Sequence, residues 1–435
     1  MSNSFLSPFI PSLFFAFIAC AVTCAAPAQS PVAPAANAAA SVAVDPWAAP
    51  DFSADPKALY EAASAVPVPD GANVVELVED ESYTFDDAGR MAHVGRIVYK
   101  VLTQKGAEGW DSLSVGWEPW HEARPQIRAR VIGPDFSVHT LDANTITEAP
   151  ARGGDYKTYS DGKRLHAPFP AIAPGVVVEE EYTEAETQPL FAPGRVGRVE
   201  LGQEDVPVAH SRVIFDAPAA LPLRTDLFLL PDVKPVRTEA GERVTLTFDV
   251  GSIDGFDPRE PYLPPDVVRF PIIAFATGVS WQSVATEYGK IVDNLSGSAV
   301  MKAFVEPLIA GKKSAAEKEA AIVDYLDREV RYTGIEFGEA AIVPHDPAET
   351  LAKKYGDCKD KATLLVAMLR AAGIPANVAL LSVESRMDVP RICPAWACSI
   401  TRSFMCPGKI RYGLTPPTAT RNLARFQWAT RGGWR

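Results

Sequence analysis

Residues 355–377, YGDCKDKATLLVAMLRAAGIPAN, contain a cysteine that is placed where it could act as a nucleophile. Cys358 is the only cysteine between residues 25 and 392. A cysteine thiolate can attack an amide carbonyl and form a thioester, provided that a base removes the thiol proton. The alternative is that Cys358 fills a core as a small apolar side chain, which is a common role for a free cysteine.

The residues around Cys358 predict a helix that begins at this position. Asp357 is a favourable N-cap, and Asp360 suits the first turn. Gly373 and Pro375 predict the end of the helix. Its apolar stripe consists of Ala362, Leu365, Val366, Leu369 and Ala372. Free amide groups of the first turn stabilise a thiolate and can donate to an oxyanion. The polar neighbours GD and KDK predict that this turn lies near the surface.

The same region resembles the cysteine region of bacterial transglutaminase-like proteins, which belong to the papain-like thiol superfamily. The resemblance rests on GDCKDKATLLVAMLRAAGIPA and on the preceding VRYTGIEFGEAAIVPHDPAETLAKKY, and it covers residues 320–381 strongly and 275–320 less so. It implies that Cys358 opens the central helix and attacks protein or peptide amides, with no cofactor and no metal. A histidine and an aspartate should follow on adjacent strands.

This chain lacks the histidine that the resemblance requires. All its histidines precede Cys358, namely His93, His121, His139, His166, His210 and His345. His345 is the nearest along the chain, but its order relative to the cysteine is wrong for the family. We interpret it as a plain loop residue and not as the base.

The composition changes abruptly in residues 391–435. This tail has eight Lys/Arg and no Asp/Glu, so it carries a net charge of +8 against −20 for residues 1–390. Hydrophobic periodicity also stops there. A basic, disordered terminus is one interpretation. The sharper interpretation is an aberrant tail, produced by a frameshift that begins between about Ser382 and Ile392.

The genetic code allows a test of that frameshift. Reading the third base of each codon with the first two of the next, CSITR (398–402) permits Phe-Asp-His-Ala, and YGLT (412–415) permits Trp-Ile-Asp. The segment FQWATRGGW permits LPVGDQGRL, in which the single codon of Trp428 fixes the glycine. In the transglutaminase-like family, motifs similar to DHA and WID supply the missing His and Asp in this order.

Two regions precede the cysteine helix, a strand-rich region and a helical region. Residues 51–255 are expected to form one domain, which is strand-like from about Asn73 to Val250, with β-branched or alternating runs at 96–103, 126–133, 175–183 and 243–250. We therefore expect an antiparallel β-rich, sandwich-like domain, and it resembles the domain of unknown function that often precedes this module in exported bacterial proteins. In the last run, Val244, Leu246, Phe248 and Val250 share one face.

The chain turns helical after a Pro-rich connector at 256–274. Apolar residues at three- and four-residue spacing predict helices over 280–295, 298–311 and 314–330. A strand at 331–337 and a loop containing PHDP (344–347) lead to the cysteine helix. Residues 275–390 are thus expected to form an incomplete α+β, cysteine-proteinase-like domain, which makes the chain multidomain.

Residues 1–25 have the pattern of an export signal. FLSPFIPSLFFAFIACAVTCAA is a nearly uncharged apolar run, followed by the small-x-small sequence APA. The usual positive start is missing, since the first Lys or Arg is Lys57. Pro8 and Pro11 interrupt the run, and it is short for a membrane span. We expect no transmembrane helix in the mature chain, and a periplasmic or secreted location.

Residues 26–50 have the Ala/Pro-rich composition of a flexible linker. Lipid attachment at Cys20 or Cys24 stays open as an alternative. An exported protein with one cysteine in its body has no internal disulfide framework, so the thiol of Cys358 is either buried or used.

The remaining patterns exclude several other functions. A net charge of −12 without a basic stripe argues against a nucleic-acid partner, and no phosphate-binding glycine loop or zinc spacing is present. The acidic run EEEY (179–182) is expected to form a solvated edge and not a metal site. Arg328, Arg331, Lys353 and Lys354 are expected to be surface charges. The rival to the enzyme hypothesis is a non-catalytic scaffold whose β-rich domain binds a cell-envelope ligand.

Overall fold

The computed structural model describes residue 45 and residues 48–151, 158–189, 194–203, 205–255, 267–278, 280–382, 400–405 and 411–413. The export signal and most of the linker lie outside these residues. None of the helices in this part of the chain is long and apolar enough to cross a membrane.

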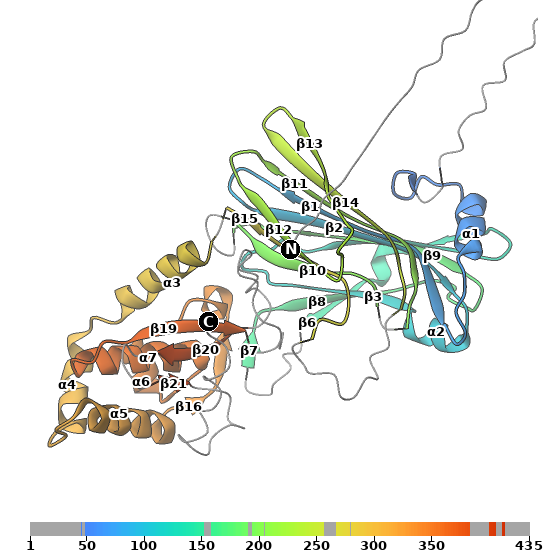
Figure 1. Ribbon diagram of the computed structural model, residues 1–435. Coiled ribbons are helices and arrows are strands. Elements are labelled where there is room, and N and C mark those ends of the chain that lie inside the picture. The colour runs from blue at the N-terminus through green and yellow to red at the C-terminus, as the bar shows by residue number, and fades with distance from the viewer. Residues whose placement is uncertain are drawn as a thin grey trace, which may run out of the picture. The chain divides into compact units, whose positions relative to one another are not determined.

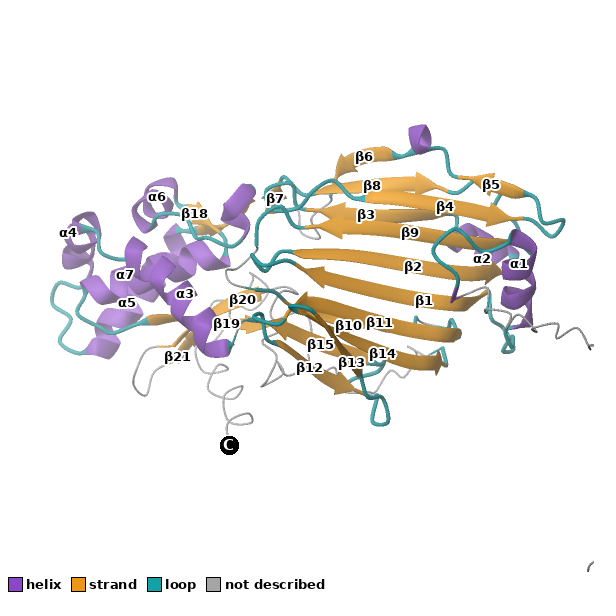
Figure 2. Ribbon diagram, turned by 90° about the horizontal axis from the view of Figure 1, so that it is seen from above, coloured by secondary structure: helices purple, strands orange, loops and turns teal. Residues whose placement is uncertain are grey.

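An eight-stranded sheet forms the centre of the β-rich region (Figures 1 and 2). In spatial order its strands are β13 (Val236–Ala240), β14 (Arg243–Ile253), β11 (Val208–Pro218), β1 (Val74–Phe85), β2 (Met91–Val101), β9 (Val177–Ala185), β4 (Gln126–Ile132) and β5 (Val138–Thr140). All four predicted strands belong to it. Its neighbours are antiparallel except β1 and β11, which run parallel.

Two three-stranded sheets pack against this main sheet. One consists of β3 (Ser112–Trp117), β8 (Lys163–Pro168) and β6 (Thr147–Pro150), and the other of β10 (Val196–Glu200), β15 (Ile272–Thr277) and β12 (Leu223–Phe228). Trp117 of the first sheet packs with Ile127 of β4, and Phe275 of the second packs with Phe215 of β11. The sandwich-like prediction is confirmed.

Helix α1 (Pro56–Ala65) packs against the main sheet, where Leu59 contacts the cluster that contains Val78 and Val98. The predicted apolar face of β14 is also present, because Val244, Leu246 and Phe248 are buried in one cluster and Val250 packs against it. Short elements complete this region: α2 (Gln104–Gly109), η2 (Ala143–Thr145) and β7 (Thr158–Ser160).

The prediction that EEEY forms a solvated edge is wrong. The run lies in β9, which pairs with β2 on one side and β4 on the other, so it is a central strand. Glu179, Glu180 and Glu181 are all buried. Glu179 accepts hydrogen bonds from the guanidinium groups of Arg96 and Arg130, at 2.7 Å and 2.6 Å. Arginines of the neighbouring strands therefore compensate the negative charge of Glu179, which allows this residue to lie in a central strand.

The C-terminal region contains the predicted helices α3 (Trp281–Leu295), α4 (Ala299–Leu308) and α5 (Ala315–Glu329). It continues with β16 (Arg331–Tyr332), β17 (Gly334–Glu336), η3 (Gly338–Ala341), α6 (Pro347–Lys353), β18 (Tyr355–Gly356), α7 (Cys358–Ala371), β19 (Asn377–Ser382), β20 (Ile400–Met405) and β21 (Arg411–Gly413). The β-rich and α+β regions together make a multidomain chain, as expected.

Three boundaries differ from the sequence-based expectations. Residues 272–277 form β15 and pair with β10 and β12, so the strand-rich region extends past residue 274. The strand expected over 331–337 is split, because β16 pairs with β18 whereas β17 pairs with β7. Within the tail that was expected to be disordered, β20 pairs with β19 and with β21. The rest of that tail lies outside the described residues.

Candidate active site

Cys358 is the first residue of α7 and is half-buried. The N-terminus of α7 is closed by a reciprocal capping box. Asp357 accepts from the amide of Asp360 at 3.1 Å, and the carboxylate of Asp360 accepts from the amide of Asp357 at 3.2 Å. The helix ends as predicted, with Ala372 as C-cap and Gly373 at φ 77°. Because the first-turn amides hold the cysteine backbone in one conformation, the position of its side chain is defined by the helix.

The prediction that the polar neighbours of Cys358 lie near the surface is wrong. Asp357, Lys359, Asp360 and Lys361 are all buried. Each has a partner that satisfies its polar atoms, which makes burial possible. The ammonium of Lys359 pairs with Asp357, and the ammonium of Lys361 donates to the Val330 carbonyl at 2.8 Å. Burial lowers the pKa of Lys361.

Helix α7 is buried on all sides, whereas the sequence predicted a single apolar stripe. Leu364, Ala367 and Met368 lie outside that stripe and are as buried as its members. Together with residues of α3, α4 and α5, α7 forms one hydrophobic cluster. A helix surrounded by other elements is fixed on several sides, so Cys358 is held by the core and not by a loop.

His345 is bound to the same helix terminus, which corrects its interpretation as a plain loop residue. Its amide donates to Asp360 at 2.9 Å, and its Nδ1 lies 3.2 Å from both carboxylate oxygens. Residues two apart on a helix do not face each other, so Asp360 and Cys358 project from different sides of α7. His345 therefore orients the capping carboxylate, and this arrangement gives no support to a role as the base for Cys358.

Gly356 allows the chain to approach α7 closely. A Cβ at this position would lie 2.6 Å from Asp360 Cβ and 3.1 Å from Thr350 Cγ2, which is closer than side chains tolerate. The close approach of Asp360 and Thr350 thus explains why the GDC motif begins with a glycine. It places Asp357 directly against the helix end.

The other predicted surface charges are mostly exposed. Arg328 pairs with Asp324, and Lys353 pairs with Glu349, both across one helical turn. Arg331 is exposed as well. Lys354 differs, since it is half-buried at φ 58° and its ammonium lies over the Tyr325 ring at 4.6 Å. It ends α6 and is not a plain surface charge.

Replacing Asp357 with Asn tests the buried charge next to the cysteine. The variant keeps a capping acceptor but removes the negative charge beside the ammonium of Lys359. Because Glu336 remains 3.7 Å from that ammonium, we expect a loss of about 2–3 kcal/mol in the free energy of unfolding, below the full cost of an unpaired buried charge.

Urea denaturation of the full chain measures this change. Asp346→Asn is the matched control, because Asp346 caps α6 in an exposed position and carries no buried partner charge. A D357N protein as stable as D346N would contradict the assigned role of the Asp357–Lys359 pair.

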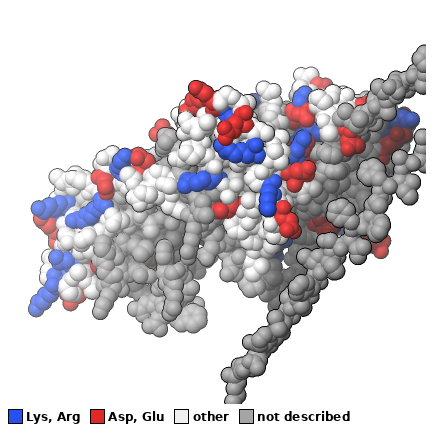
Figure 3. All heavy atoms as spheres, turned by 45° about the horizontal axis from the view of Figure 1, so that its top comes forward, with Lys and Arg blue, Asp and Glu red and all other residues white. Residues whose placement is uncertain are grey.

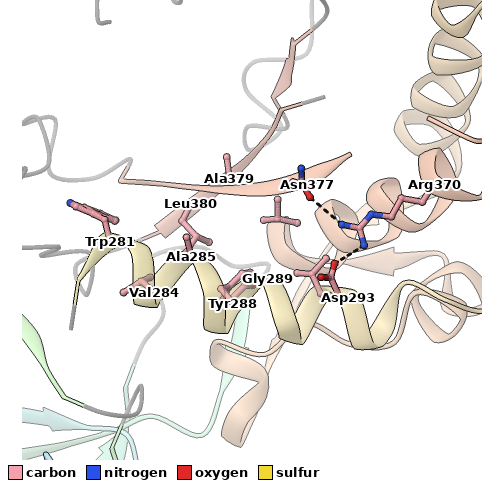
Figure 4. Close-up of a pocket in the computed structure, with 12 residues that line it drawn as sticks. Trp281, Val284, Ala285, Tyr288, Gly289, Asp293, Arg370, Asn377, Ala379 and Leu380 are labelled. Atoms are coloured by element: carbon pink, nitrogen blue, oxygen red, sulfur yellow. Dashed lines mark hydrogen bonds and ion pairs between the residues drawn. The ribbon is translucent and has the colours of Figure 1, made fainter. Parts of the chain in front are cut away.

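An apolar groove of about 410 Å³ lies between α3 and β19 (Figure 4). Trp281, Tyr288 and Leu380 contribute to its walls. At one end the Arg370 guanidinium donates to Asp293 at 2.7 Å and to Asn377 at 3.2 Å. Cys358 does not line this groove. The groove is therefore separate from the thiol.

Charged side chains are mixed over the described surface that faces the viewer in Figure 3. Lys and Arg alternate there with Asp and Glu, and no continuous basic face is visible. Within the described ranges, no group of three or more His, Cys, Asp or Glu is placed to hold a metal ion.

Family comparisons agree with this arrangement. Residues 87–256 match a domain of unknown function with a solved structure, DUF3857, and residues 302–392 match the transglutaminase-like superfamily. The chain thus carries a DUF3857 match followed by a transglutaminase-like match. The second match ends at residue 392, and no curated protein sequence matches the chain.

Among solved structures, the chain is similar to a proposed protease from Parabacteroides distasonis. The two share 19% identity with a TM-score of 0.66, over 79% of this chain and 68% of the other, which is a likeness of fold. A proposed cysteine protease from Cytophaga hutchinsonii also matches, at 13% identity and a TM-score of 0.22, over 48% of this chain and 70% of the other. The C-terminal region thus matches the transglutaminase-like superfamily over residues 302–392.

The sequence did not reveal the buried ion pairs around the helix start. Asp357 and Lys359 flank Cys358 in a polar run, and such a run usually marks a solvated turn. The signal that could have found them is the apolar run that begins at Ala362, because charged residues at the start of a buried helix need internal partners.

Proposed function

We propose that this chain is a transglutaminase-like acyl transferase or amide hydrolase in which Cys358 is the nucleophile. The observation that carries the proposal is the position of the cysteine at the first residue of α7, behind a buried and reciprocally hydrogen-bonded cap. The family match over residues 302–392 supports it. The substrate class is a protein or peptide amide.

The chemistry follows from the cysteine and the helix terminus. The Cys358 thiolate attacks the amide carbonyl, a C–S bond forms, and the C–N bond breaks as the amine leaves with a proton. Amide groups of the first turn are available to stabilise the oxyanion. Water or a second amine then attacks the thioester, and the thiol is regenerated.

The chain as written lacks the group that must move these protons. No histidine follows Cys358 in the sequence, and His345 is engaged with Asp360 on a different side of α7. An imidazole normally takes the thiol proton and returns it to the leaving amine. We therefore propose that this chain is inactive, and that a frameshift near residues 382–392 removed the His and Asp. Resequencing the DNA across codons 380–395 tests the frameshift directly.

Alkylation of Cys358 separates a nucleophile from a structural thiol. Because α7 presents its first-turn amides at the cysteine, we expect iodoacetamide to react with Cys358 in the folded chain with an apparent pKa below the ordinary thiol value of about 8.5. The pH profile of the alkylation rate, followed by mass spectrometry, measures this pKa.

Ala362→Cys in a Cys358→Ala background is the matched control for alkylation. Ala362 lies in the same helix and is fully buried, so its thiol should react slowly. Equal rates at the two positions, or an ordinary pKa for Cys358, would overturn the nucleophile assignment.

The second candidate function is a non-catalytic scaffold that acts in the cell envelope. The observation that favours it is the lack of a histidine after Cys358, together with a cavity in the β-rich region that is described below. The export-like residues 1–25 support a periplasmic or secreted location for either function. A full chain that is exported, binds an envelope ligand and carries an inert thiol would favour the scaffold.

A further inference from the structure

The β-rich region contains a cavity of about 500 Å³ between the main sheet and the sheet of β3, β8 and β6. Residues of β2 and β9, which are adjacent strands in Figure 2, form one wall, and residues of β3 form the other. Three aromatic side chains contribute to the lining, namely Tyr99, Trp110 and Tyr182. The rings of Tyr99 and Trp110 meet edge to face, with their centroids 4.7 Å apart.

A buried carboxyl group faces this cavity without a full set of partners. Glu180 lines the cavity although it is only 6% exposed. One of its oxygens, Oε2, accepts from the Tyr99 hydroxyl at 3.4 Å. Among the described residues, Oε1 has no hydrogen-bond partner. This oxygen faces the cavity, so it can accept a hydrogen bond from a donor that enters it.

A second buried carboxyl group lies beside it. Glu76 is fully buried, and its Oε1 accepts from Gln203, which also lines the cavity, at 3.3 Å. Its Oε2 has no partner among the described residues. Glu79 lies near Glu76 on the same strand, and it accepts from the Gly202 amide at 3.1 Å and from the Ser211 hydroxyl at 2.9 Å.

The acidic residues on the two faces of the main sheet differ in their ion-pair partners. On one face, Glu179 and Glu181 pair with arginines of adjacent strands. On the cavity face, none of the ion pairs among the described residues involves Glu76, Glu79 or Glu180. On the cavity face, Glu184 of β9 pairs with His93, whereas no cation is paired with Glu180 among the described residues.

We propose that this cavity binds the ammonium group of an organic amine, with Glu180 as its counter-ion. The carboxylate oxygens of Glu180 would accept from the ammonium, and the rings of Tyr99, Trp110 and Tyr182 would surround it, since aromatic faces attract cations. The cavity is far larger than a metal ion requires, and its lining combines aromatic rings with carboxyl groups. The site uses no group of the α+β region and is independent of Cys358.

Protonation of the acids links amine binding to pH. Burial raises the pKa of Glu180 to about 8. Burial also raises the pKa of Glu79, which hydrogen bonds from Gly202 and Ser211 bring back to about 7. Burial and the neighbouring carboxyl groups raise the pKa of Glu76. Glu180 is therefore largely protonated at pH 6, and an ammonium that pairs with it must displace its proton.

Other titratable groups also lie around Glu180. They come from β1, β2, β9 and the segment before β3, and they are Glu81, His93, Tyr99, Asp111, Tyr182 and Glu184. Burial opposes the charged form of His93, but hydrogen bonds to Glu184 and Glu81 raise its pKa to about 9. His93 thus stays charged between pH 6 and 8, and both tyrosines stay neutral because burial raises their pKa values.

Titration of the full chain with n-butylamine tests the proposal. We expect saturable binding, seen by calorimetry and by a change in tryptophan fluorescence, since Trp110 lines the cavity. The affinity should rise about tenfold per pH unit from pH 6 to 8 and level off above. Proton release, measured in two buffers of different ionisation enthalpy, should accompany binding at pH 6. N-butylacetamide has the same alkyl chain without the charge, and it should not bind.

The variant Glu180→Gln keeps the shape and should bind n-butylamine at least about tenfold more weakly at pH 8, with a flatter pH profile. Glu108→Gln is the matched control, because Glu108 is exposed on the nearby helix α2, and its affinity should equal that of the parent chain. Equal binding by E180Q and E108Q, equal binding of the amide, or no saturable binding of the amine would each overturn the proposal. If E180Q does not fold, the pH profile and the proton release of the parent chain decide the question.

Discussion

A chain whose reading frame is restored between residues 382 and 392 is expected to gain thiol-dependent activity on amides, which the chain as written lacks. The restored segment would supply a histidine to take the Cys358 proton and an aspartate to orient that histidine. Loss of such a group typically costs several orders of magnitude in rate, so we expect a gain of at least about 10⁴-fold. Ammonia release from a glutamine-containing protein, and incorporation of a fluorescent primary amine into it, measure the two outcomes of the thioester.

Cys358→Ala in the repaired chain is the control for that experiment. It should abolish both reactions while leaving the fold intact, because a half-buried cysteine at a helix start can be replaced by alanine with little loss of packing. Activity that survives in this variant would place the chemistry elsewhere. A repaired chain that neither hydrolyses amides nor incorporates amines would leave the enzyme hypothesis without support.

Replacing Glu179 with Gln is expected to destabilise the β-rich region severely. Glu179 is fully buried, and it joins the buried guanidinium groups of Arg96 and Arg130 across three adjacent strands. The amide cannot neutralise them. Arg96 would keep its ion pairs with Asp51 and Asp80, at 3.3 Å and 3.5 Å, but the buried charge of Arg130 would lose its carboxylate partner. We expect a loss of about 3–5 kcal/mol in the free energy of unfolding, which is typical when one partner of a buried pair is removed.

The same strand provides a matched control. Glu181 lies two residues further along β9 on the same face, and its partner Arg128 is 56% exposed. Solvent screens that pair, so Glu181→Gln should cost only about 0–1 kcal/mol. Thermal unfolding followed by circular dichroism compares the two variants. Similar melting temperatures for E179Q and E181Q would refute the central role of the Glu179 network.

Elements whose bounds and apolar faces follow from local residue patterns could be predicted from the sequence. The alternating residues of β14 and the capped helix α7 could be predicted, because local geometry alone decides which side chains share a face and where a helix starts. The parallel pairing of β1 with β11 could not be predicted. Pairing between strands far apart in the chain depends on the whole topology, and no local residue type encodes it.

The candidate site could be predicted only in part. Helix capping and the family resemblance pointed to Cys358, but the burial of Lys359 and Asp360 was missed. Charged residues at a helix start are usually solvated, and only tertiary contacts show that each has an internal partner. The same reason applies to EEEY, where arginines on neighbouring strands convert an apparently exposed acidic run into a central strand.

The parallel pairing of β1 with β11 also affects how the chain is made. Glu79 of β1 and Ser211 of β11 are 132 residues apart, which at about 5–20 residues per second means roughly 7–25 s of synthesis. During this interval β2 can pair with one edge of β1, but the other edge of this 12-residue strand has no partner. An open strand edge is a template for pairing with other chains. The risk of aggregation on the ribosome is therefore greatest in the middle of synthesis, before any residue of the cysteine helix exists.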